Sequence, residues 1–381
     1  MWHLFTEDPK KVMLMFDAER LAILATEYCI SVSEGKKIRI LGNVVATPLI
    51  GQLYKHILLK GGHPIPELRS DGFEELLFTY GSEKQITFVS PSDRVLVSEV
   101  DAVIEIFAES NTKRLSTVDP TKLKQHVASR RELTDIFVKR LLRAGTYSVL
   151  PYPTQAFAQD AEMGLLEYED FVAKACLLDK KNPVKEWRQI STMQDKVVRR
   201  LNKAKSMRFV GEDTDLSLRV EGRTWINCDG HANMPDGEIF TCPIENSAQG
   251  QIRFTYPGIY ARMGREVEDI VLTFKNGQVV KAEAEKGEDF LKEILKTDDG
   301  ARRIGEIAFG TNIGITKFTK SILFDEKMGH CIHLALGFSP FSKETGGKNQ
   351  SSVHWDLLKN MRSGEAYADN ELVYEKGRFL L

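Results

Sequence analysis

The spacing of hydrophobic residues changes near residue 205, and this change constrains the fold most strongly. Before it, apolar residues recur at helical spacing (i, i+3, i+4, i+7), as in residues 21–28. After it, apolar and polar residues alternate, as in residues 216–220, which is typical of half-buried strands. We therefore expect two domains of different structural class, residues 1–205 and residues 206–381.

Short apolar segments separate the helices predicted in the first domain. Residues 37–41, 95–97 and 103–107 are predicted as strands. A helix with Ile50, Leu53, Tyr54 and Ile57 on its buried face should end at Gly61-Gly62. Strands alternating with helices predict an α/β domain with a mainly parallel sheet. The strand ending at residue 41 leads into no GxGxxG, so the phosphate loop of a dinucleotide-binding domain is absent.

Residues 155–205 are predicted to be helical, with a buried stripe of Ile190, Met193, Val197 and Leu201. Beyond them, residues 270–274 and 278–282 flank Asn276-Gly277, a pair that accepts the positive φ angles of a type I′ turn. This is a strong hairpin signal. We expect the second domain to be a β-rich α+β domain.

Charge and composition exclude several classes of function. The chain has 52 basic and 54 acidic residues and a formal net charge of −2, so a generally polybasic nucleic-acid binder is excluded. The basic run between Lys196 and Arg208 is interpreted as the solvated face of a helix. No apolar run approaches the ~20 residues of a membrane span, and acidic residues among the first 20 argue against a secretory signal. Five scattered cysteines without a CxxC favour reduced thiols in the cytoplasm.

Carboxylates and imidazoles gather in the second domain. His354 and Asp356 are two residues apart, so on a strand their side chains lie on the same side. Glu238, Glu306, Glu326 and His333 would have to converge on the same point from separate segments. Such oxygen and nitrogen ligands suit zinc, cobalt or manganese. Several carboxylates ionise together in a small site only if cations neutralise them, as two divalent ions ~3.5–4 Å apart would. Taken singly, these signals are weak, because a lone histidine on a strand is usually structural and Glu306 could simply form a salt bridge.

Four ordered blocks of sequence give these residues a context. They are residues 233–241 (NMPDGEIFT), 305–310 (GEIAFG), 323–326 with 333–337 (LFDE, HLALG), and 346–356 (GGKNQSSVHWD). Through these blocks most of the chain resembles the thermophilic metalloaminopeptidase family, the group that includes aminopeptidase T and aminopeptidase S.

The resemblance implies a fold and an activity. It implies an α/β amino-terminal domain, a carboxy-terminal domain with a two-metal site, and a cytoplasmic homodimer that removes residues from peptides with a free amino terminus. The implied metal ligands are Glu238, Glu306, Glu326, His333, His354 and Asp356. Glu306 resembles the carboxylate between the two metals, and Glu306 or Glu238 would move the proton of the attacking water. No nucleic-acid or membrane partner is expected.

One departure from the family keeps other functions open. Similar sequences have a tyrosine shortly after the HxALG segment, whereas this chain has none between His333 and His354 and has Phe341 in that region. Ser339, Ser342 or Lys343 could replace the missing hydroxyl, or activity could be reduced, altered or lost. One alternative is a non-peptidase descendant that binds a metal or a partner. Another is a metal hydrolase with a non-peptide substrate, whose ligands would look identical.

Overall fold

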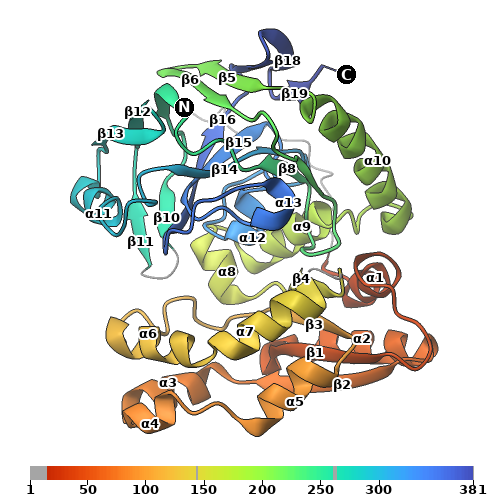
Figure 1. The fold of residues 1–381 in the computed structure, drawn as a ribbon. Coiled ribbons are helices and arrows are strands. Elements are labelled where there is room, and N and C mark those ends of the chain that lie inside the picture. Colours follow the sequence, from red (N-terminus) through yellow and green to blue (C-terminus); the bar gives the residue numbers. More distant parts are fainter. Residues whose placement is uncertain (1–14, 143–144, 261–263, 381) are drawn as a thin grey trace, which may run out of the picture.

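The computed structural model describes residues 15–142, 145–260 and 264–380, and it contains an α/β part and a strand-rich part (Figure 1). The α/β part is built on a parallel sheet of four strands in the order β2-β1-β3-β4. This confirms the predicted class of the first half. Its strands are β1 (Lys37–Asn43), β2 (His63–Arg69), β3 (Ala102–Phe107) and β4 (Tyr147–Pro151).

Helices connect these strands. α2 packs through Leu49, Ile50, Leu53 and Ile57, and the chain turns at Gly61, whose φ is 77°. The helices are α1 (Ala18–Leu24), continued by a π-helical turn (Ala25–Cys29), α2 (Thr47–Leu59), α3 (Asp71–Tyr80), α4 (Glu83–Ile86), α5 (Pro91–Glu99), α6 (Pro120–Ser129) and α7 (Arg131–Phe137), with a 3-10 turn at Val44–Ala46 and a second π-helical turn at Val138–Leu142.

Two predictions in this half were wrong. Residues 95–97 belong to helix α5 rather than to a strand, because Ser90 caps that helix by accepting from the Ser92 amide and Pro91 begins it. Three consecutive apolar residues are too few to distinguish the helical repeat of 3.6 residues from the strand repeat of two. Tyr54, assigned to the buried face of α2, is 40% exposed.

Three helices link the two parts, as predicted for residues 155–205. They are α8 (Gln155–Asp160), α9 (Leu165–Ala175) and α10 (Pro183–Leu201). Val197 and Leu201 of α10 are buried and Met193 is half-buried, whereas Lys196 and Arg199 are exposed. The basic run therefore includes a solvated helix face.

The strand-rich part contains two antiparallel sheets. One has eight strands in the order β13-β12-β9-β6-β5-β17-β18-β19, and the other has five in the order β16-β15-β14-β8-β7. The predicted hairpin is present, with φ angles of 50° at Asn276 and 78° at Gly277. The strands are β5 (Ser206–Gly211), β6 (Thr214–Arg219), β7 (Ile226–Cys228), β8 (Glu238–Thr241), β9 (Gln249–Arg253), β12 (Val271–Lys275), β13 (Gln278–Glu283), β14 (Ile304–Gly310), β15 (Cys331–Gly337), β16 (His354–Asn360), β17 (Glu365–Ala368), β18 (Glu371–Glu375) and β19 (Arg378–Phe379).

Smaller elements complete this part. They are the two-stranded ribbon of β10 (Gly258–Tyr260) and β11 (Arg265–Val267), and the helices α11 (Glu288–Ile294), α12 (Ile322–Asp325) and α13 (Ser342–Thr345). This part contains many strands and only a few short helices, which confirms the β-rich class predicted for the second half. No helix of the described ranges is both long enough and apolar enough to cross a bilayer.

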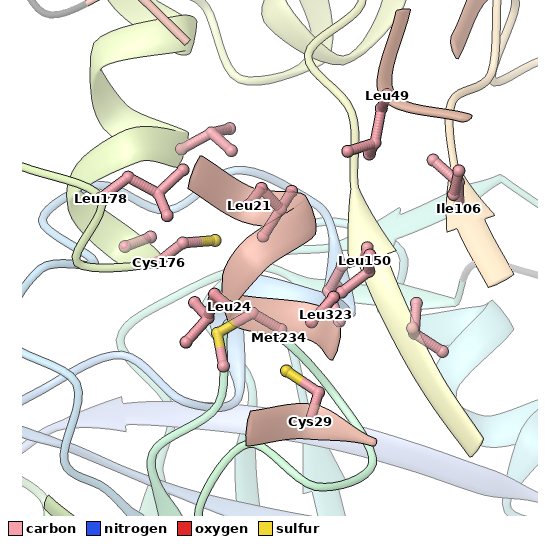
Figure 2. Packing of buried hydrophobic residues seen from close by; sticks show 14 of the residues in the cluster. Leu21, Leu24, Cys29, Leu49, Ile106, Leu150, Cys176, Leu178, Met234 and Leu323 are labelled. Carbon is pink, nitrogen blue, oxygen red and sulfur yellow. The ribbon is translucent and has the colours of Figure 1, made fainter. Parts of the chain in front are cut away.

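Two large hydrophobic clusters hold the molecule together. One lies between the eight-stranded and the five-stranded sheet and contains side chains such as Phe209 and Phe309. The other joins the two parts of the fold, because Leu21 and Leu150 of the α/β part share it with Met234 and Leu323 (Figure 2). The predicted domain boundary near residue 205 is thus crossed by a continuous apolar cluster.

The main chain also joins the two parts. At the edge of the parallel sheet, the amide of Val149 on β4 donates to the carbonyl of Ala232 (2.9 Å), and the Met234 amide donates to the carbonyl of Val149 (2.8 Å). This bridge runs parallel and places residues 232–234 as a short extension of the sheet. The same segment leads, four residues later, into β8.

Candidate metal centre

Strands β8, β14 and β15 of the five-stranded sheet are buried along their whole length, and alternation along the strands separates an apolar face from a polar one. On β15, Ile332, Leu334 and Leu336 enter the cluster between the sheets, so His333 faces the other way. On β16, Trp355 and Leu357 enter the cluster, and His354 and Asp356 face away from it. The sequence prediction that His354 and Asp356 share one side is confirmed.

A β-bulge places Glu306 on the polar face. Ile304 pairs with Leu336 and Glu306 pairs with Ala335, so two steps along β14 oppose one step along β15. Ile304 can therefore lie in the apolar cluster although Glu306, two residues on, faces the opposite side. The bulged residue is Gly305, where a Cβ atom would lie 2.2 Å from the Gly337 carbonyl oxygen. Only glycine fits this close approach.

Sheet register then aligns the polar side chains across four strands. Glu238 on β8 is opposite Gly310 on β14, and Ala335 on β15 is opposite both Glu306 and Asp356. Glu326 comes from outside the sheet, directly after helix α12. The structure therefore brings together all six residues singled out in the sequence, from five separate segments.

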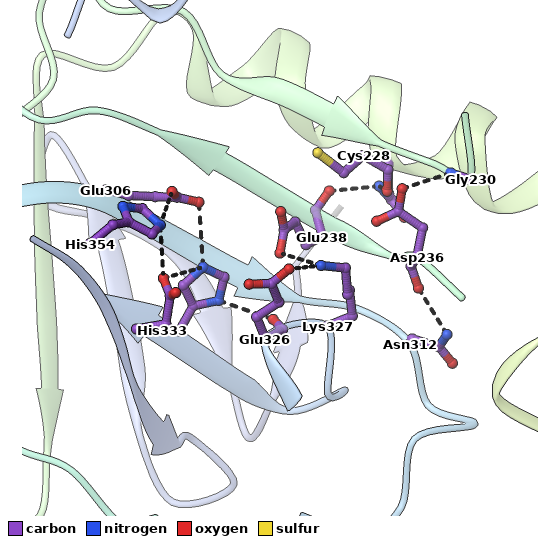
Figure 3. Close-up of polar contacts among 12 residues, drawn as sticks. Cys228, Gly230, Asp236, Glu238, Glu306, Asn312, Glu326, Lys327, His333 and His354 are labelled. Atoms are coloured by element: carbon purple, nitrogen blue, oxygen red, sulfur yellow. Dashed lines mark hydrogen bonds and ion pairs between the residues drawn. The ribbon is translucent and has the colours of Figure 1, made fainter. Parts of the chain in front are cut away.

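The donor atoms form two overlapping groups that share His333. One group contains Glu306, His333 and Asp356, and the other contains Glu238, Glu326 and His333; within each, one atom per residue lies within 4.8 Å of the others. The Nε2 atom of His333 is 3.4 Å from Glu306 Oε1 and 3.9 Å from Asp356 Oδ1. Figure 3 shows Glu306, His333 and His354 close together, with Glu238 and Glu326 beside them.

His354 completes the first group. Its Nε2 atom is 3.5 Å from Asp356 Oδ1 and 3.8 Å from Glu306 Oε2. Both imidazoles are oriented through their other nitrogen, because Nδ1 of His333 donates to the Glu326 carbonyl (3.0 Å) and Nδ1 of His354 donates to the Phe338 carbonyl (3.0 Å). Such hydrogen bonds fix the tautomer and turn Nε2 toward the carboxylates.

Buried carboxylate oxygens that accept no hydrogen bond indicate that the site fits a cation. Both carboxylate oxygens of Asp356 and the Oε2 atom of Glu238 are buried and accept no hydrogen bond from the residues that the structure describes. Burial raises the pKa of Glu306, and the charges of Glu238 and Asp356 raise it further, whereas the hydrogen bond with His333 acts to lower this pKa. Oxygen and imidazole donors in this state suit a divalent ion, which would satisfy and neutralise them.

Residues that sequence analysis missed hold strand β8 in place. The side-chain amide of Gln194, fully buried on α10, donates to the carbonyls of Glu238 (2.9 Å) and Cys228 (3.0 Å). Asn312 donates to the carbonyl of Asp236 (2.8 Å). A glutamine next to the apolar stripe of a helix gives no signal in the sequence, because its partners lie more than 30 residues away.

The segment before His354 is held by Asp298. This carboxylate accepts from the Ser351 hydroxyl, from the amide and hydroxyl of Ser352, and from the Ala301 amide. Burial acts to raise the pKa of Asp298, but these hydrogen bonds outweigh it and hold the pKa at about 2.

We expect Asp298→Asn to change how stability depends on pH. Because the folded pKa is depressed, the stabilisation by Asp298 is present above the unfolded pKa of ~3.9. It is lost as the pH falls through about 2. Unfolding followed by circular dichroism should show a weaker pH dependence for Asp298→Asn than for wild type between about pH 4 and pH 2. The exposed neighbour Asp299 provides the control, and equal profiles for Asp298→Asn and wild type would contradict the prediction.

The segment that lacks the tyrosine lies beside the centre. The Phe338 ring is 6.4 Å from the His354 ring, and the Phe341 ring is 6.0 Å from that of Phe240 on β8. Of the suggested substitutes for the hydroxyl, Ser339 is fully buried, with its side chain beside Cys242, and Lys343 is exposed on α13. His330, Cys331 and Cys242, which were not assigned as ligands, are in neither donor group found among the described residues.

Comparisons with known proteins agree with this architecture. The model of the thermophilic metalloprotease family (M29) matches residues 16–379. Aminopeptidase 2 of Geobacillus stearothermophilus is 26% identical over 90% of this chain and 91% of its own. Aminopeptidase T of Thermus aquaticus is 30% identical over 56% of this chain and 59% of its own. The structure of wild-type AmpT from Thermus thermophilus covers 96% of this chain and 99% of its own with a TM-score of 0.80 at 22% identity, which shows the same fold.

Proposed function

Since the chain belongs to the thermophilic metalloprotease family (M29), we propose that it is a metal-dependent aminopeptidase. Its relatives are named aminopeptidases, and the proposed substrates are peptides with a free amino terminus. The observation that carries the proposal is that both carboxylate oxygens of Asp356 are buried, lack a hydrogen-bond donor among the described residues, and lie beside Glu306, His333 and His354.

The proposed ligands are the six residues singled out in the sequence, and zinc, cobalt or manganese suits them. Bound there, a divalent ion would lower the pKa of a water molecule and polarise the scissile carbonyl. The Glu306 carboxylate is near both imidazoles and is our first candidate to accept a proton from the attacking water. Glu238 is the second candidate for this role. Main-chain hydrogen bonds to Nδ1 hold both imidazoles while this happens.

The experiment is hydrolysis of a panel of amino-acid anilides and dipeptides by the purified chain. The chain should be assayed after removal of metal by a chelator and after reloading with zinc, cobalt or manganese. We expect activity that the chelator abolishes, that metal restores, and that acetylation of the substrate amino group prevents. Failure of every loaded form to cleave any substrate would overturn the proposal.

The missing tyrosine favours a second candidate, a descendant of the same fold that binds a metal or a partner without hydrolysis. The region after the HxALG segment presents the rings of Phe338 and Phe341, and removing one donor to an oxyanion typically lowers the rate ~10²–10³-fold. Metal binding without hydrolysis of any substrate would favour this candidate. The cytoplasmic location and the homodimer expected from the family remain part of the proposal, and size-exclusion chromatography tests the dimer.

A further inference from the structure

A lysine side chain lies inside the candidate metal centre. Lys327 follows Glu326 directly, and its side chain is completely buried. Its backbone is fixed, because its amide donates to the Phe324 carbonyl (3.1 Å) and its carbonyl accepts from the Asn312 amide (3.1 Å). The sequence analysis passed over this residue, since a lysine after a glutamate is usually exposed.

The ammonium group of Lys327 lies between two of the proposed ligands. It pairs with the carboxylate of Glu326 and is 3.8 Å from Oε2 of Glu238. Figure 3 marks both contacts. These two carboxylates, with His333, are the whole of the second donor group. The ammonium therefore already places a positive charge beside the carboxylates of Glu238 and Glu326, inside the protein.

A divalent ion in the second group would be repelled by this ammonium. An ion bound to Glu238 and Glu326 would have to lie within a few ångströms of Nζ, and like charges at such a distance inside a protein repel strongly. The first group is different, because it offers four residues that can ligate a metal, namely Glu306, His333, His354 and Asp356. Both carboxylate oxygens of Asp356 also accept no hydrogen bond in the described part of the chain. Three or four such ligands are enough for one ion.

We infer that the ammonium of Lys327 takes the place of one of the two divalent ions, so that the centre binds a single ion at Glu306, His333, His354 and Asp356. The inference rests on the proposed function, which supplies the metal, and departs from the two ions per chain expected from the family resemblance. Glu238 and Glu326 then act as partners of the lysine rather than as metal ligands.

The test is to count the ions that the full-length chain binds. Metal-free protein is saturated with Zn²⁺, desalted and analysed by plasma mass spectrometry, with calorimetric titration as a second count. We expect one ion per chain for wild type and two for Lys327→Met, which removes the charge and keeps much of the volume. Lys359→Met is the matched control: Lys359 is also buried, but its Nζ donates to the carbonyls of Glu212 and Arg253, so this variant should bind one ion.

A measurement on wild type keeps the test decisive if Lys327→Met does not fold. With Mn²⁺ in place of Zn²⁺, electron paramagnetic resonance should show the spectrum of isolated ions, without the exchange coupling of a close pair. Two ions per chain in wild type would overturn the inference and leave the proposed function standing. One ion in both wild type and Lys327→Met would also overturn it, because Lys327 would then not be what excludes the second ion. No bound metal in wild type would overturn the inference and the proposed metal-dependent function together.

Discussion

Replacement of Glu306 by glutamine should abolish hydrolysis, weaken metal binding and leave the fold largely intact. The amide keeps the size and shape of the side chain, but it removes the negative charge that faces His333 and His354. It also removes the group proposed to accept the proton of the attacking water. Loss of a positioned general base alone typically lowers a rate ~10²–10⁴-fold, so we expect a loss of at least that size.

The measurement is kcat/KM on a cleaved anilide, together with metal content per chain. Glu105→Gln is the matched control, because Glu105 is also a strand glutamate, accepts from the Tyr147 hydroxyl (2.6 Å), and lies in the parallel sheet. The control should keep its metal and its activity. Wild-type activity in Glu306→Gln would show that the site assignment is wrong.

Of the substitutions proposed here, Phe309→Ala should cause the largest loss in the free energy of unfolding. This fully buried ring on β14 packs against rings from the facing sheet, with centroid distances of 5.8 Å to Phe209, 5.1 Å to Tyr374 and 4.8 Å to Phe379. Truncating such a side chain removes its burial and leaves a cavity, which typically costs about 3–5 kcal/mol. Proteins of this kind are stable by only about 5–15 kcal/mol.

Urea unfolding followed by fluorescence and circular dichroism would measure the change in the free energy of unfolding. Phe73→Ala is the control, because Phe73 on α3 is 74% exposed and its truncation should change stability by less than about 0.5 kcal/mol. A loss below about 1 kcal/mol for Phe309→Ala would contradict the prediction and would mean that the core around residue 309 closes over the smaller side chain.

Periodicity predicted the two structural classes correctly because burial differs so clearly between them. Residues 216–220 alternate because one face of β6 meets the apolar cluster between the two antiparallel sheets. Residues 21–28 follow helical spacing because α1 and the π-helical turn after it pack into the other cluster. The prediction was wrong for residues 95–97, where the run was too short and the Ser-Pro start of a helix decided the structure. The division into domains at residue 205 stays a prediction.

The candidate centre was harder to predict than the fold. Spacing placed only His354 and Asp356 together, because they share one strand; the family resemblance implied that the other four candidates join them in one site. Their convergence depends on sheet register and on the bulge at Gly305, and neither is marked in a single sequence. Lys327 and Gln194 were missed for the same reason, since their burial follows from segments distant in the chain.

The main-chain bridge between β4 and residues 232–234 means that the two parts of the fold cannot be treated as separable modules. A fragment beginning at residue 206 would lose the strand against which Ala232 and Met234 are hydrogen-bonded, and with it the anchor of the segment that enters β8 at Glu238. Its apolar side chains Met234 and Leu323 would also lose their partners from the first half. The amino-terminal sheet thus serves as scaffolding for the chemistry, and mutations that loosen its edge should weaken the candidate centre from a distance.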